Sequence, residues 1–257
     1  MEKPVPLHTI FEARYERGYR YLDRCGDAML VLESLLQKIS GEPWWPDEMT
    51  PTRAKISCPA LEASVSFDAY RMGVDGLSDI TRYDFRQICE SVMATIVGRF
   101  DLQKIIRLGY RSICGVVAES IEAAEQLSAK RSPCPNWPPA KTGEFSLVSS
   151  EVVNVFEDAD RSRGWRLSIG PSNKPEAPTQ LDERLRLPSR LLPNGQRDAL
   201  VKQLNRRREN ERDPLACLKI DVDFYQFDPG GLDPRQFIDW ARGLEKDIQN
   251  AALTRGK

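Results

Sequence analysis

Histidine is almost absent from this chain, because His8 is the only one among 257 residues. Histidine is the side chain that titrates near neutral pH without help, and it is the commonest metal ligand. A Ser–His–Asp or Cys–His relay would therefore have to use His8, at the edge of the first expected strand. This scarcity pushes any enzyme hypothesis toward carboxylates, Lys, Arg and Mg²⁺-type chemistry.

Closely spaced cysteines and long apolar runs are also missing. The chain has six cysteines, no two of them form a C-x-x-C pair, and their spacing matches no zinc pattern. We interpret them as structural thiols. No window approaches the ~18 uninterrupted apolar residues of a membrane span, and the N-terminus lacks a signal-peptide pattern. We therefore expect a cytoplasmic protein without a membrane segment.

The chain carries almost no net charge, since 37 Lys and Arg residues face 38 Asp and Glu residues. No overall positive charge is present to drive counterion release from nucleic acid. The hydrophobic fraction of 40% is too high for a disordered chain. The length is enough for one large domain or two modest ones, without a disulfide or metal to hold the fold.

Hydrophobic periodicity predicts an α+β fold. Period-two alternation predicts strands over 9–17, 61–72, 103–113, 144–157, 164–170 and 215–227. Helical spacing predicts helices over 22–39, 82–100, 116–130, 196–211 and from Asp233-Pro234 onward. The four prolines within 40–60 favour an irregular loop there. We expect a largely antiparallel sheet of about six strands, with amphipathic helices covering one face.

A Pro-rich stretch at 132–139 is the best candidate boundary between two halves, 1–131 and 132–257, although one continuous domain is also consistent with the pattern. A weak internal repeat supports the division. Ser66–Tyr70 aligns with Asp221–Tyr225 at an offset of 155, and in both places a strand leads through a Gly-containing turn into a helix. The halves are therefore either related strand–turn–helix units or unrelated units under the same constraints.

Two pairs of charged residues alternate along expected strands. Asp221 and Asp223 share one strand face, so their carboxylates could hold Mg²⁺, or they are simply a solvated surface. Arg107 and Arg111 flank Gly109 on another strand, and guanidinium groups grip phosphate or carboxylate with two parallel hydrogen bonds. The alternative is that the two arginines form ion pairs with the two aspartates from a neighbouring strand.

Further binding candidates lie in loops and in a basic segment. Trp44, Trp45 and Trp137 stand beside prolines, where they either anchor a partner or fold back over the core. The most basic local stretch contains Lys202, Arg206, Arg207 and Arg208, but acidic residues follow it at once. This stretch is either a solvated helix surface or a contact for RNA or DNA.

The segments Ile106–Arg111 and Leu218–Asp223 carry a resemblance. With them, the chain resembles a sporadically distributed bacterial family of uncharacterised proteins of about 250 residues, which share an Arg-x-Gly-x-Arg strand and a late Asp-bearing strand before a C-terminal helix. The family has no established catalytic residue, so the resemblance implies none here. Its patchy distribution implies phage defence or toxin immunity.

We therefore expect a non-catalytic binding protein, a subunit or sensor of a bacterial defence or immunity system, without a cofactor and with another protein as its partner. The expected binding residues are Arg107, Arg111, Asp221, Asp223 and the three loop tryptophans. The first alternative is a Mg²⁺-dependent enzyme acting on a phosphate-containing substrate, with the aspartates on the metal and the arginines on the phosphate. The second is a nucleic-acid-binding accessory protein that uses Lys202 and the arginines after it.

Overall fold

The computed structural model describes residues 4–77, 82–131, 152–172, 195, 198, 200–202, 216–231 and 233–254. Its strands join into one nine-stranded sheet in which every neighbouring pair is antiparallel, in the order β2-β3-β4-β5-β1-β6-β9-β8-β7. The α+β class is confirmed, but the expected number of about six strands is too low. Within the described residues, no helix is long and apolar enough to cross a membrane.

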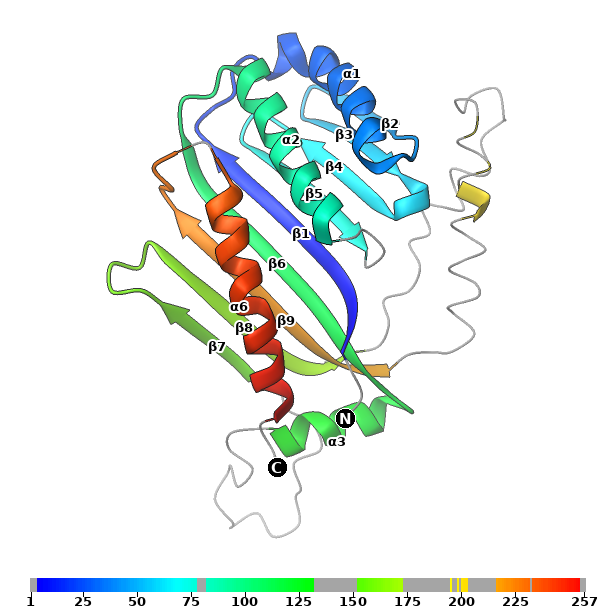
Figure 1. Cartoon of the computed structure of the whole chain (residues 1–257), viewed down its shortest axis with the longest axis vertical. Helices are drawn as coiled ribbons and strands as arrows, with labels where there is room; N and C mark the ends of the chain where they lie inside the picture. The colour runs from blue at the N-terminus through cyan, green and yellow to red at the C-terminus, as the bar shows by residue number, and fades with distance from the viewer. Residues whose placement is uncertain are drawn as a thin grey trace.

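The first part of the chain forms the β2 end of the sheet and two long helices (Figure 1). Its elements in chain order are β1 Val5–Tyr15, α1 Tyr21–Ser40, β2 Trp45–Thr50, β3 Arg53–Cys58, the short 3-10 helix Pro59–Leu61, β4 Ala63–Phe67, β5 Arg71–Leu77 and α2 Arg82–Phe100. The later elements are β6 Ile105–Ala118, α3 Ile121–Arg131, β7 Val152–Glu157, β8 Arg163–Ser172, β9 Ala216–Phe227 and α6 Arg235–Thr254.

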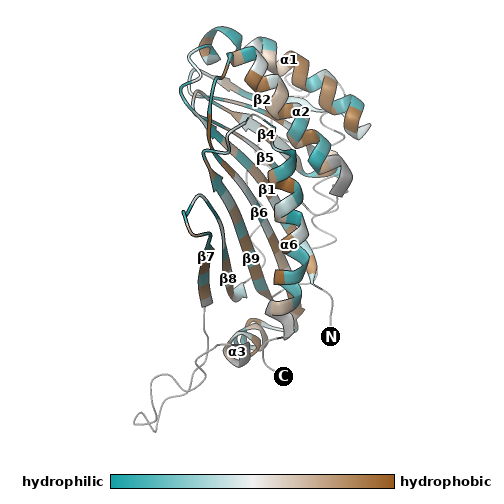
Figure 2. Ribbon diagram, turned by 60° about the vertical axis from the view of Figure 1, so that its left-hand side comes forward, coloured by the Kyte–Doolittle hydropathy of each residue, from teal (hydrophilic) through white to brown (hydrophobic). Residues whose placement is uncertain are grey.

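Helices α1, α2 and α6 lie on one side of the sheet (Figure 2). The core fills the space between them, because alternate residues of each strand point to the helices and are apolar. On β1 these residues include Phe11 and Ala13, and on β9 they include Val222 and Phe224, each fully buried. The helix α6 is also held by polar contacts, because Tyr110 on β6 donates a hydrogen bond of 3.1 Å to Glu245.

The helices α1 and α2 begin and end within one residue of the predicted bounds, and α6 begins where the sequence predicts it. The Asp233 side chain accepts a hydrogen bond of 2.9 Å from the Arg235 backbone N–H, which is the expected cap of α6. The helical spacing of apolar residues over 22–39 also predicts that Leu22 is buried. This prediction is wrong, because Leu22 is 65% exposed and its neighbour Tyr21 is buried instead. In the sequence Thr81 is the candidate N-cap of the helix over 82–100, and it lies outside the described residues.

Two strand predictions are wrong. The expected loop over 40–60 contains β2 and β3, which pair with each other and tolerate Pro46 because β2 is an edge strand. The expected single strand over 61–72 is the hairpin β4–β5. The turn between β4 and β5 contains no glycine or proline. Its conformation is stabilised by the Asp68 side chain, which accepts backbone hydrogen bonds from Tyr70 at 2.7 Å and Arg71 at 3.0 Å.

The strands expected over 144–157 and 164–170 appear as β7 and β8, which pair with each other as a hairpin. Residues 144–151 of the first expected strand lie outside the described part. The expected helix over 116–130 begins later, because β6 continues to Ala118. The Pro-rich boundary at 132–139 and most of the expected helix over 196–211 also lie outside the described residues.

Two units of the chain, 5–100 and 105–254, share an order of elements. In each unit the first strand pairs with the last strand, and a helix follows that last strand: β1 with β5 before α2, and β6 with β9 before α6. The first strands of the two units, β1 and β6, pair with each other at the centre of the sheet. The proposed alignment at an offset of 155 is wrong, because it matches the β4–β5 turn to the middle of β9, whereas β5 is the counterpart of β9 by position in the sheet.

Candidate functional site

The side of the sheet opposite α1, α2 and α6 carries a cluster of charged side chains, which we name the charged face. Its members are Glu12 of β1, Arg107 and Arg111 of β6, and Asp221 and Asp223 of β9. They alternate with the buried apolar residues of the same strands and therefore point away from the core. The structure thus brings together the two arginines and two aspartates that the sequence singled out on strands, and it adds Glu12.

Arg111 and Asp221 form the tightest pair of the charged face. Arg111 donates from Nε and Nη2 to the two carboxylate oxygens of Asp221, at 2.8 and 2.6 Å, which is the two-pronged geometry that suits guanidinium. The Asp221 side chain is only 8% exposed, whereas that of Arg111 is 45% exposed. The bond to Asp221 raises the pKa of Arg111. The ion-pair alternative is therefore confirmed for these two residues.

Arg107 reaches its partners by lying along its own strand. Its guanidinium is 3.2 Å from Glu12 and 3.8 Å from Asp223, and its side chain is 18% exposed. A Cβ atom added at Gly109 would stand 3.1 Å from Nη1 of Arg107, so the glycine makes the space that this side chain fills. The Arg-x-Gly-x-Arg pattern thus lets both arginines converge on the aspartates, and the room over Gly109 is occupied by Arg107 itself.

Asp223 stands between the two arginines. Burial raises its pKa above the ordinary value, and the positive charges of Arg107 and Arg111 act in the opposite direction. Arg111 binds the carboxylate of Asp221, and Arg107 lies 3.8 Å from the carboxylate of Asp223, so each aspartate has an arginine beside it. Within the described residues, no group of three or more His, Cys, Asp or Glu side chains is placed to hold a metal ion.

The rim of the charged face extends across the sheet to both sides. Arg166 of β8 lies directly opposite Asp223 in register, and it is exposed. Tyr225 lies over Gly164 of the neighbouring strand and donates a hydrogen bond of 2.7 Å to Glu157. On the other side, Arg14 lies 2.7 Å from Glu12. Sequence reasoning missed Glu12 and Arg166, although both occupy polar positions in alternating strands, because alternation does not show which strands are neighbours.

The three tryptophans that the sequence offered as binding residues have different positions in the structure. Trp44 is 1% exposed and donates a hydrogen bond of 3.0 Å to Ser40, so it belongs to the core and offers no surface to a partner. This is the alternative in which the segment folds back over the core. Trp45 is half-buried on the edge strand β2, and Trp137 lies outside the described residues.

The basic segment and the cysteines are described only in part. Lys202 is helical and exposed, whereas Arg206, Arg207 and Arg208 lie outside the described residues. The interpretation of the cysteines as structural thiols is consistent with the four that are buried and unpaired: Cys58, Cys89, Cys114 and Cys217. Burial raises the pKa of Cys58 to about 11, so its thiol stays protonated and unreactive near neutral pH.

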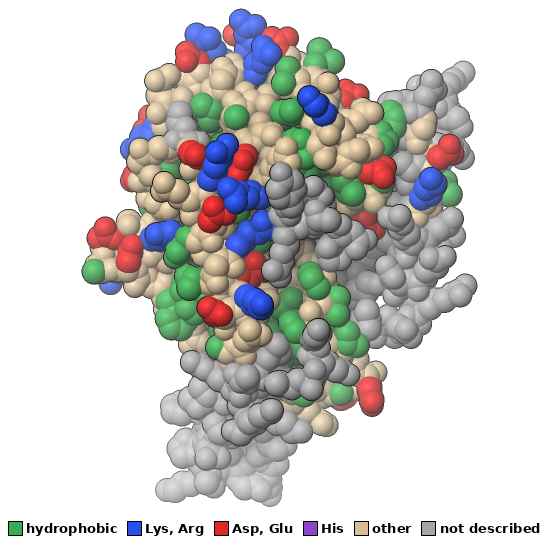
Figure 3. All heavy atoms as spheres, viewed as in Figure 1, with side chains coloured by type: hydrophobic (Ala, Val, Ile, Leu, Met, Phe, Trp, Pro, Cys, Tyr) green, Lys and Arg blue, Asp and Glu red, His purple; other side chains and the backbone are tan. Residues whose placement is uncertain are grey.

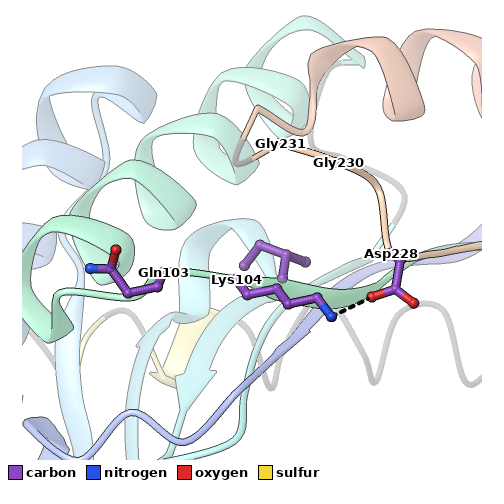
Figure 4. A pocket seen from close by; sticks show the side chains of 6 residues that line it. Gln103, Lys104, Asp228, Gly230 and Gly231 are labelled. Carbon is purple, nitrogen blue, oxygen red and sulfur yellow. Dashed lines mark ion pairs between the residues drawn. The ribbon is translucent and has the colours of Figure 1, made fainter.

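A shallow pocket of about 320 Å³ lies where β6 begins and β9 ends (Figure 4). Lys104 and Asp228 face each other across it at 3.0 Å, and Gly230 and Gly231 form its opposite wall. The segment 228–231 is the turn that leads into α6, as expected, and Asp228 and Gly230 adopt positive φ there. Since Lys104 is already paired with Asp228, the charges of this pocket satisfy each other.

On the helix side, basic and acidic side chains lie next to one another (Figure 3). Arg86 of α2 contacts Asp239 of α6 at 2.9 Å, and Arg235 of α6 contacts Glu90 of α2 at 3.2 Å. These pairs join the two helices, and each places opposite charges side by side.

No protein-family model matches this sequence, and no curated protein matches it. The charged face is therefore the feature from which a function is inferred.

Proposed function

We propose that this protein is a non-catalytic partner-binding protein and that the charged face contacts the partner. The observation that supports the proposal is the engagement of the two aspartates by Arg111 and Arg107. Carboxylates that arginines already hold are oriented before a partner arrives, and they form part of the open surface of the sheet. Such a surface suits contact with another macromolecule better than it suits enclosure of a small substrate.

The exposed groups of this surface indicate the chemistry of the partner. Arg111 keeps an exposed fraction of 45% although it binds Asp221, and Arg166 is exposed two strands away. Arginine is enriched at the energetic centres of protein interfaces, because its guanidinium binds carboxylates with fixed geometry. We propose that the partner is a protein with acidic side chains on its contact surface.

The setting of the interaction is also a proposal. We infer that the protein is cytoplasmic and serves as a subunit or sensor of a bacterial defence or immunity system, as the resemblance of the Ile106–Arg111 and Leu218–Asp223 segments implies. The shared order of elements in the units 5–100 and 105–254 supports an origin by duplication of one unit.

The test uses Arg166→Glu, since this residue is exposed and forms no ion pair with a buried carboxylate among the described residues. Arg111 is less suitable, because its removal strands the buried Asp221 carboxylate at a cost of about 3 kcal/mol. The tagged protein is co-expressed with the products of its neighbouring genes, and the affinity for each captured protein is measured. We expect Arg166→Glu to weaken binding about tenfold and added salt to weaken it further.

The matched control is Arg24→Glu, an exposed arginine of α1 on the helix side, which should leave binding unchanged. Equal binding by both variants, or no partner among the neighbouring products, contradicts the proposal. A Mg²⁺-dependent turnover that is lost in the double variant Asp221→Asn, Asp223→Asn would favour the enzyme alternative. Salt-sensitive binding of RNA or DNA would favour the nucleic-acid alternative.

A further inference from the structure

The two edge strands of the sheet differ in how they are protected. Natural proteins guard exposed edges with proline, charge or short strands, because an unpaired row of backbone groups pairs with other chains. The edge strand β2 carries Pro46, Asp47 and Glu48. The edge strand β7 is equally short, but it carries no proline and no charge before its last residue, Glu157. Three of its side chains are apolar and exposed, with Val153 at 46%, Val155 at 57% and Phe156 at 42%.

We infer that β7 pairs with β7 of a second copy of this chain, antiparallel and about a twofold axis at Asn154, so that the two sheets become continuous. In an antiparallel pair, residues directly opposite each other lie on the same face of the sheet. Centring the axis on Asn154 places Val153 opposite Val155 of the other copy, and Asn154 opposite its own equivalent. Apolar residues then meet apolar residues, and amides meet amides.

The surroundings of β7 fit this pairing. Phe156 stacks on Trp165 of β8 with ring centroids 3.9 Å apart and an interplanar angle of 17°, so its exposed ring is held in one orientation. The one charged residue of the strand is engaged within its own chain. Glu157 accepts a hydrogen bond from Tyr225 at 2.7 Å and lies 3.7 Å from Arg161, so it does not have to be neutralised by the partner.

The same arrangement already exists inside the molecule. The strands β1 and β6 pair antiparallel at the centre of the sheet, and the helices α2 and α6, which belong to the units 5–100 and 105–254, lie on the same side of it. A twofold axis through Asn154 perpendicular to the sheet repeats this geometry between copies, with the helices of both copies on one side. Because a strand of six residues offers a small interface, we expect dissociation constants in the micromolar range.

The experiment measures the molar mass of the full chain by light scattering and sedimentation, from about 1 µM to about 100 µM. We expect the wild type to pass from monomer to dimer over this range. Val155→Lys should remain a monomer, since it places a charged side chain opposite the apolar Val153 of the other copy on both sides of the axis. Met49→Lys is the control, because Met49 is 64% exposed on the guarded edge strand β2, and this variant should dimerise like the wild type.

A second measurement tests the register. Asn154→Cys should form a disulfide-linked dimer under mild oxidation, and adding Val155→Lys should abolish it, while the wild type treated in the same way gives the background from its own cysteines. Circular dichroism and melting curves confirm that each variant is folded. A wild type that is monomeric at about 100 µM, or a dimer that survives Val155→Lys, overturns the inference. Loss of the dimer in Val155→Lys without cross-linking at position 154 overturns the register.

Discussion

At the scale of single residues, the charged face depends on how closely each acidic group is matched to an arginine. Asp221 has two hydrogen bonds from Arg111, whereas Asp223 lies 3.8 Å from Arg107 and makes a looser pair. Burial therefore outweighs the attraction at Asp223, and the pKa of its carboxyl is raised above the ordinary value of 3.8. Two aspartates that look equivalent in sequence thus differ in their electrostatics.

The raised pKa of Asp223 has a consequence for stability. A carboxyl whose folded pKa is raised contributes stability below its unfolded pKa and loses that contribution as the pH rises through the folded value. Asp223→Asn keeps the neutral form at every pH. We therefore expect the unfolding free energy of the variant, relative to the wild type, to increase from about pH 4 to about pH 7.

Urea unfolding at the two pH values measures this difference, and Asp101→Asn at an exposed position gives the background change. If the difference decreases with rising pH, the arginines outweigh burial at Asp223 and the assignment is wrong.

At the scale of elements, two glycines decide how large side chains lie on the sheet. Gly109 leaves space for Arg107, and Gly164 leaves space for Tyr225. At Gly164 the fit is the tighter one, because an added Cβ would stand 2.4 Å from the backbone oxygen of Phe156 and 2.8 Å from the hydroxyl of Tyr225. Backbone atoms of a paired strand cannot move aside as the end of a flexible side chain can.

We therefore expect Gly164→Ala to lower the unfolding free energy by about 2 kcal/mol, the cost of overpacking. Gly243→Ala in α6 is the matched change, since nothing lies within 4 Å of the added carbon, and it should raise the unfolding free energy by about 0.5–1 kcal/mol. Urea unfolding of both variants tests the pair. Equal effects of the two substitutions would mean that the close approach at Gly164 is relieved without cost.

At the scale of the whole molecule, one sheet joins both ends of the chain. The strand β6, from the first expected half, pairs along its length with β9, from the second. The halves 1–131 and 132–257 therefore share a continuous ladder of backbone hydrogen bonds. Neither β6 nor β9 is an edge strand. The helices α2 and α6, which lie on the same face of the sheet, are joined by ion pairs.

We expect the chain to unfold in a single cooperative transition, because separating the halves would expose an unpaired central strand in each. Far-ultraviolet circular dichroism follows all elements, and tryptophan fluorescence reports from Trp44 near one end of the sheet and from Trp165 near the other. The two signals should give coincident urea transitions. Separate midpoints would show that the halves are independent folding units.

The sequence alone determined the local features of this protein. Alternation placed Ile220 and Val222 in the core and Asp221 and Asp223 on the opposite face, because side chains of a strand point to alternate sides whatever its neighbours are. Only the tertiary structure decided that β6 and β9 are neighbours, since pairing between strands so distant along the chain leaves no mark in the spacing of either one. For the same reason, only the folded chain showed that Arg111 forms its ion pair with Asp221 and that β7 is an edge strand of the described sheet.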